Sequence, residues 1–179
     1  MKSIEAVKLL HKWDKKKRCL FRSRELGLIF NEQGNTLRST LRRLIEDGVL
    51  VKVAHDAYLY AFNHLDRSLI GEIAVFLRPG EFTYESLESA ASQWGVISQV
   101  PLGRVTCVTT GRAGEVSTPF GVIDYEHTDD FLPDLGGFVV DRTEFNALPI
   151  ATKQRAVADL VAHDRSTELI DWKEVDDEG

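Results

Sequence analysis

Cysteines are scarce in this chain, and long apolar runs are absent from it. Its 179 residues include two cysteines, Cys19 and Cys107, which lie far apart and form no CxxC pair, so neither a disulfide framework nor a thiolate zinc site is predicted. No apolar run approaches the roughly 18 residues that a membrane-spanning helix needs. Lysines interrupt the first apolar residues and no small-residue cleavage site follows, so no secretory signal is expected. We therefore expect a cytoplasmic protein with reduced cysteines and no membrane partner.

Residues 62–179 also lack the short motifs that mark common catalytic sites. They contain no HxxxH or HExxH zinc spacing, no GxxxxGK[ST] phosphate loop, no GxSxG nucleophile elbow and no GxGxxG dinucleotide turn. The apolar and β-branched neighbours of Cys107 favour a core thiol over a nucleophile. Asp129, Asp130 and Asp134 could hold a divalent metal in a nucleic-acid enzyme, although an acidic loop explains them more simply. We expect no metal, no cofactor and no enzymatic activity.

Charge is divided unevenly along the chain. The net charge of −6 arises from 22 Lys+Arg and 28 Asp+Glu. Residues 1–61 hold 13 of the basic and 7 of the acidic residues, whereas residues 62–179 hold 9 and 21. A basic segment can meet phosphate, and an acidic segment repels it. Together with a hydrophobic content of 43%, which predicts a packed core, this division favours two folded modules with different partners.

The first module is predicted to begin with three helices. Apolar periodicity indicates a helix over residues 2–13, and Ser23 is a plausible N-cap for a second helix over residues 24–31. After a polar turn, a third helix extends to about residue 47, where Gly48 fits the left-handed position that ends helices. Two strands then form a hairpin, over residues 49–54 and 58–62 with a turn at 55–57.

This element order predicts an α+β protein with two domains. Residues 1–62 are interpreted as a winged helix-turn-helix DNA-binding domain, a unit that places one helix in the DNA major groove. Residues 63–179 are interpreted as a mixed α/β C-terminal domain. Its predicted helices cover residues 69–77, 84–94 (capped by Thr83) and 151–162, and its predicted strands cover residues 105–110, 115–118, 122–127 and 138–140.

The third predicted helix combines an apolar stripe with an arginine-bearing outer face. Leu37, Leu41 and Leu44 fall within one arc and anchor the helix. Arginine suits the outer face because its planar fork can bond guanine O6 and N7 together or clamp a phosphate. An ordinary solvated helix, whose arginines pair with Glu46 and Asp47, is the simpler alternative. The predicted DNA-facing residues of this helix are Thr36, Arg38, Ser39, Arg42 and Arg43.

Other basic residues flank this helix and could contact phosphate. Four follow the first predicted helix, one precedes the second helix, and one lies on the hairpin. Backbone contacts to DNA are common at these places in the motif. These residues are Lys15, Lys16, Lys17, Arg18, Arg22 and Lys52. The predicted partner of the first module is therefore double-stranded DNA.

Three ordered blocks of the sequence carry a family resemblance: RRLIEDGVLVKVAHDAYLY, RPGEFTYESLESAASQWGVISQVP and VTCVTTGRAGEVSTPFGVIDYEHT. These blocks resemble the AbiEi-type antitoxin family, the antitoxin half of type IV toxin–antitoxin (abortive infection) systems. The last two are the specific ones, because LESAASQWGVIS and TTGRAG…TPFG…HT are not generic patterns. The resemblance covers about residues 20–130 of the chain.

The resemblance implies a two-domain antitoxin. Its winged helix would bind inverted repeats in the promoter of its own operon and repress transcription. Its C-terminal domain would counter a toxin similar to nucleotidyltransferases, without needing a stable complex. The hairpin turn departs from the family, which often has a glycine before the tyrosine. This chain has His55-Asp56-Ala57-Tyr58, and such an acidic tip argues against deep insertion into the minor groove. The alternative is a free-standing winged-helix regulator whose C-terminal module senses a ligand.

Overall fold

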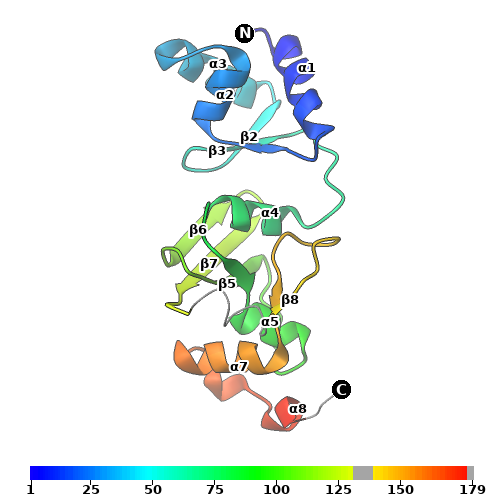
Figure 1. Cartoon of the computed structure of the whole chain (residues 1–179), viewed down its shortest axis with the longest axis vertical. Helices are drawn as coiled ribbons and strands as arrows, with labels where there is room; N and C mark the ends of the chain where they lie inside the picture. The colour runs from blue at the N-terminus through cyan, green and yellow to red at the C-terminus, as the bar shows by residue number, and fades with distance from the viewer. Residues whose placement is uncertain (131–138, 177–179) are drawn as a thin grey trace. The chain divides into compact units, whose positions relative to one another are not determined.

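Two compact units make up the chain, Met1–Asp66 and Arg67–Gly179. The computed structural model describes residues 1–130 and 139–176. It is a mixed α+β structure, as the sequence predicts, with a separate sheet in each unit (Figure 1). The sequence places the domain boundary after residue 62, and the boundary between the compact units falls after residue 66. Across the described ranges, no helix has both the length and the apolar content needed to cross a membrane.

Three helices and a three-stranded antiparallel sheet form the first unit. The strand order is β1-β3-β2, so β3 is the central strand, and all four of its residues are buried. Because β3 is covered on both faces, it carries no polar–apolar alternation. The elements are α1 (Ser3–Asp14), β1 (Leu20–Phe21), α2 (Ser23–Phe30), α3 (Gly34–Glu46), β2 (Leu50–Ala54) and β3 (Ala57–Tyr60).

The turn between α2 and α3 depends on a close approach of the backbone. A Cβ atom on Gly27 would lie 2.9 Å from the carbonyl oxygen of Glu32 and 3.1 Å from the side chain of Leu37. Asn31 ends α2 in the left-handed conformation, with φ 52°. A glycine inside α2 therefore lets the chain fold back, so that α3 can pack beside it.

The sequence predicts the helices of this unit well and their ends less well. The helices expected over residues 2–13, over residues 24–31 and up to about residue 47 are present as α1, α2 and α3, and Gly48 ends α3 with φ 69° as predicted. Ser23 is wrong as an N-cap, because Arg22 occupies that position. Its backbone N–H donates to Glu25 Oε2 at 2.7 Å, which satisfies one of the open donors at the start of the helix.

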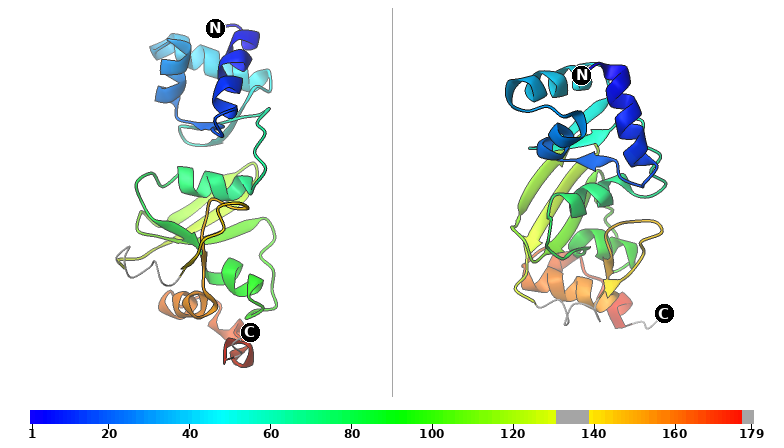
Figure 2. Two further views of the ribbon diagram at one scale, coloured as in Figure 1. Left: turned by 45° about the vertical axis from the view of Figure 1, so that its right-hand side comes forward. Right: turned by 45° about the horizontal axis from the view of Figure 1, so that its top comes forward.

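The second unit is built on a six-stranded mixed sheet of order β6-β7-β5-β4-β9-β8. Figure 2 shows β5, β6 and β7 side by side, in agreement with their pairing. Helices α5 and α7 pack with the sheet around a shared apolar core that includes Tyr84, Val108 and Leu160. The elements are α4 (Leu69–Phe76), β4 (Thr83–Glu85), α5 (Leu87–Gln93), β5 (Arg104–Thr109), β6 (Gly114–Thr118), β7 (Gly121–His127), β8 (Val139–Val140), β9 (Ile150–Ala151), α7 (Lys153–Ala162), a 3-10 turn at Thr167–Leu169 and α8 (Trp172–Asp176).

Two helix predictions in this unit are partly wrong. The segment expected as a helix from residue 84 begins instead as strand β4, and α5 starts only at Leu87. Thr83 is therefore a strand residue paired with Thr109, and the N-cap of α5 is Ser86. The helix expected from residue 151 likewise begins at Lys153, after the two-residue strand β9. In both places, pairing with a neighbouring strand overrides a helical apolar pattern.

A buried carboxylate ties strand β4 to helix α7. Asp159 accepts hydrogen bonds from the Tyr84 hydroxyl at 3.0 Å and the Ser86 hydroxyl at 2.6 Å. The guanidinium of Arg155 completes the arrangement, with its Nε 2.8 Å from Asp159 Oδ1. Burial raises the pKa of Asp159 above its ordinary value even though these groups favour the ionised form. The network therefore depends on the neighbouring arginine.

Replacing Arg155 with Met is expected to destabilise the protein by about 3 kcal/mol, because it leaves a buried carboxylate without its cation. The matched control is Asp130→Asn, which removes the half-exposed partner of the same arginine. That change should lower the free energy of unfolding by less than about 1 kcal/mol. Urea denaturation of both variants measures the difference. Equal effects would show that the buried pair contributes no more than the exposed one.

Candidate nucleic-acid interface

Helix α3 buries one face and exposes the residues predicted to meet DNA. Leu41 and Leu44 are buried against the rest of the unit. The predicted contact residues Thr36, Arg38, Ser39, Arg42 and Arg43 lie outside that buried face. This separation follows from the 3.6-residue period, since the leucines recur on one side and the arginines fall on the other.

An open groove lies between α3 and the β2–β3 hairpin. Its volume is about 480 Å³, and Arg38, Arg42 and Lys52 line it. Leu37, Tyr58 and other mainly apolar residues form most of the remaining wall. The structure thus brings together two predicted helix residues and the predicted hairpin lysine. Three cations around one groove make it an attractive surface for anionic groups.

The two groove arginines have weak partners inside the protein. Arg38 Nη1 lies 3.4 Å from Asn35 Oδ1. Arg42 Nε lies 3.9 Å from Glu46 Oε1, and both side chains are more than half exposed. Exposed pairs of this kind contribute about 0–1 kcal/mol, so these arginines can exchange their partners at little cost. An ordinary solvated helix would pair its arginines with Glu46. The pair between Arg42 and Glu46 is present, at the N–O distance of 3.9 Å.

Arg43 differs from the other two arginines of α3. Its guanidinium donates to the carbonyl oxygen of Met1, so it faces the N-terminal end of α1. Near it, the Ser3 hydroxyl donates to the carboxylate of Asp47 just after α3. The C-terminal part of α3 is therefore joined to the beginning of α1.

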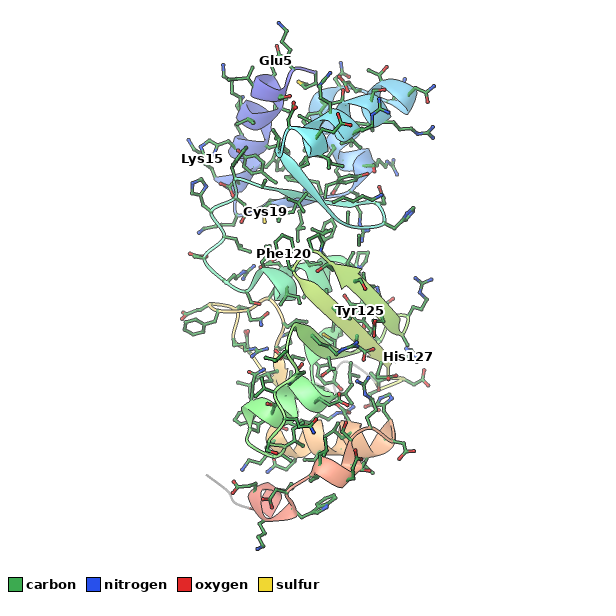
Figure 3. All side chains as sticks on the ribbon, turned by 180° about the vertical axis from the view of Figure 1, so that it is seen from behind. Glu5, Lys15, Cys19, Phe120, Tyr125 and His127 are labelled. Atoms are coloured by element: carbon green, nitrogen blue, oxygen red, sulfur yellow. The ribbon has the colours of Figure 1, made fainter. Side chains whose placement is uncertain are left out.

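The lysine cluster, Lys15 to Lys17, lies at the opposite end of α1. Helix α1 has 12 residues, which places its two ends about 18 Å apart at 1.5 Å per residue. Figure 3 shows Lys15 where this helix ends. Lys15, Lys16 and Lys17 are exposed, and Lys17 Nζ lies 3.5 Å from Asp66 Oδ2. The lysine cluster therefore lies away from Arg43, which faces the other end of the same helix.

Arg18 and Arg22 have partners within the unit. The Arg18 guanidinium pairs with Glu25, and it lies 5.4 Å from the ring centroids of both Trp13 and Phe21. Arg22 is half-buried at the N-cap of α2. The sequence did not predict these interactions, because a run of basic residues does not indicate which side chain packs against the protein. Contact of either arginine with DNA stays a prediction.

The turn of the hairpin is held against the start of α2. Asp56, with φ 54°, accepts a hydrogen bond from the backbone N–H of Ser23 at 3.0 Å. Burial alone would raise the pKa of the Asp56 carboxyl, but hydrogen bonds from Ser23 and the charge of Arg22 lower it below its ordinary value. The acidic residue of the turn therefore faces a helix N-terminus, where negative charge is favourable.

The two aspartates of the predicted acidic cluster that the structure describes contact different partners. Asp129 pairs with His127 at 3.0 Å, and Asp130 pairs with Arg155. Asp134 lies outside the described residues. Cys107 is buried, and burial raises the pKa of its thiol, in agreement with a core role. Within the described residues, Asp129 and Asp130 therefore contact different partners.

No model of a known protein family matches the chain, and no curated protein sequence matches it.

Asp56→Asn is expected to lower the free energy of unfolding by about 1 kcal/mol at pH 7, because Asn keeps the left-handed turn but loses the charge at the helix N-terminus. The folded-state pKa of Asp56 is depressed, so its contribution is present above the unfolded pKa of about 3.9 and is lost as the pH falls through the folded value. The difference between wild type and variant should therefore shrink as the pH falls below about 4, as chemical denaturation across pH would measure.

The control for this experiment is Glu46→Gln, which removes the same charge from an exposed side chain of α3. It should change the free energy of unfolding by less than about 0.5 kcal/mol, both at pH 7 and below about pH 4. A deficit of Asp56→Asn that persisted unchanged at the lowest pH would contradict the role of charge.

Proposed function

We propose that the first unit is a winged helix-turn-helix that binds double-stranded DNA, with α3 as the recognition helix. The observation that carries this proposal is the groove between α3 and the hairpin, with Arg38, Arg42 and Lys52 around it. Two helices joined by a tight turn and followed by a hairpin are the element order of this motif. In it, the N-terminal part of the second helix contacts base edges.

In the proposed complex, the residues of α3 have two roles. Arg38 and Arg42 bond base edges, for which the guanidinium fork matches guanine. Thr36 and Ser39 lie in the first turns of the helix, where short hydroxyl side chains can bond either bases or phosphates. Lys52 and the lysine cluster contact phosphate, which sets orientation and affinity without reading sequence.

We further propose that the whole chain is an AbiEi-type antitoxin that represses its own operon and neutralises a nucleotidyltransferase-like toxin. Support comes from the resemblance of its sequence blocks, two of which supply β4, α5 and strands β5 to β7 of the second unit. Charge gives further support. Residues 1–66 hold 13 basic and 8 acidic residues, whereas residues 67–179 hold 9 and 20. The acidic second unit is a poor DNA surface, so its role is assigned to the toxin rather than the operator.

Arg38→Ala combined with Arg42→Ala is expected to weaken binding to the operon's own promoter at least about tenfold, since removing each base-specific bond costs about 1–3 kcal/mol. Gel shifts against promoter and unrelated DNA measure this effect. Replacing Lys15, Lys16 and Lys17 with Ala should instead weaken binding to both DNAs and reduce the salt slope by about 0.9 for each phosphate that is no longer neutralised. Arg112→Ala, an exposed arginine of the second unit, serves as the control. Intact promoter binding by the double arginine variant would refute the assignment of α3.

The same double arginine variant should separate the two proposed activities. A promoter reporter should lose repression, while cells co-expressing the partner toxin should still be protected, because protection is assigned to the second unit. A free-standing regulator would give no protection even as wild type. Loss of protection together with loss of repression would place the antitoxin activity in the first unit.

A further inference from the structure

Three metal-ligating side chains converge beside the end of α1, outside the groove between α3 and the hairpin. His11 and Asp14 are three residues apart on α1 and so share one face of the helix. His64 comes from the segment that follows β3. One ligand atom from each residue lies within 4.8 Å of the others. In the described ranges, no other trio of His, Cys, Asp or Glu side chains meets this criterion.

The buried carboxylate of Asp14 is the centre of this cluster. Its side chain is 6% exposed, whereas those of His11 and His64 are 44% and 74% exposed. Asp14 Oδ1 accepts the backbone N–H of His64 at 3.0 Å, which orients the carboxylate. The other oxygen, Oδ2, lies 2.6 Å from Nδ1 of His64 and 4.0 Å from Nδ1 of His11. A buried carboxylate needs a cation or hydrogen-bond donors, and here both imidazoles face it.

We propose that His11, Asp14 and His64 bind one divalent transition-metal ion, with Zn²⁺ as the representative ion. Zn–N and Zn–O distances of about 2.0–2.1 Å imply ligand atoms about 3.3 Å apart in a tetrahedral site. From the observed separations, His64 moves outward by less than about 1 Å and His11 moves inward by a similar amount. The metal replaces the hydrogen bond between His64 Nδ1 and Asp14 Oδ2, and water fills the fourth position.

The chemistry of the three ligands selects the class of ion. Two imidazoles and one carboxylate suit zinc and its neighbours in the first transition row, whereas calcium and magnesium prefer oxygen ligands. The hydrogen bond from the His64 backbone to Asp14 is the kind of outer contact that holds a ligating carboxylate in place. The bound ion would join α1 to the segment leading from β3 to residue 67, at the end of α1 that carries the lysine cluster. This inference does not depend on DNA binding.

The test is a zinc titration of the full chain, without a polyhistidine tag and after treatment with a chelator. Calorimetry should give one zinc ion per chain, and zinc should raise the melting temperature. His11→Gln and His64→Gln should each weaken binding at least about tenfold. Both side chains are substantially exposed, and Gln can still donate a hydrogen bond to Asp14, so both variants should fold. His55→Gln, an exposed histidine of the same unit, should bind zinc like the wild type.

Co²⁺ supplies a second readout that does not rest on stability. The chain should bind Co²⁺ with the visible absorption of a four-coordinate site, and His64→Gln should lose that absorption. Circular dichroism of the metal-free variants checks that each is folded. Zinc binding that is unchanged in both histidine variants, or that falls equally in His55→Gln, would overturn the proposal, as would the absence of any zinc binding by the wild type.

Discussion

The contact between Asp56 and the start of α2 is the constraint on which the first unit's exposed surface depends. It holds the hairpin turn against α2, the helix that leads into α3. Helix α3 and the hairpin then form the two walls of one groove. The same contact explains an acid in the turn. A carboxylate is favourable at a helix N-terminus, and Asp tolerates the left-handed conformation that the turn requires. The acidic residue of the turn therefore stabilises the fold. Lys52 is the cation that the hairpin contributes to the groove.

The sequence predicts elements best where a single period covers a whole segment. Leu37, Leu41 and Leu44 identify α3 and its outer face without help from any other part of the chain. Strand β1 gives no such signal, because it has two residues and exists only through its pairing with β3. The segment from residue 84 shows the same limit, since Tyr84 fits a helical pattern yet lies in a strand held by its neighbour β5. Local patterns specify helices, and strands of two or three residues depend on distant partners.

The candidate sites divide in the same way. Exposure of Arg38 and Arg42 follows from helical period alone, so the sequence could predict it. The packing of Arg18 on Trp13 and Phe21 could not be predicted, because it depends on how the loop folds back. The sequence also could not predict the cluster of His11, Asp14 and His64. A search for short spacings such as HxxxH cannot detect a ligand about 50 residues away in the chain.

The groove arginines and the lysine cluster would have different roles in the proposed function. Base contacts by α3 would depend weakly on salt, whereas phosphate contacts by the lysine cluster would carry most of the salt dependence. Specificity and overall affinity could then change independently. The inferred metal site directly precedes the lysines, since Asp14 is followed by Lys15. If occupancy of that site alters how the lysines meet phosphate, thermodynamic linkage requires DNA to change the metal affinity by the same factor. Metal titration with and without duplex would therefore measure the coupling, and duplex titration with and without metal should give the same factor.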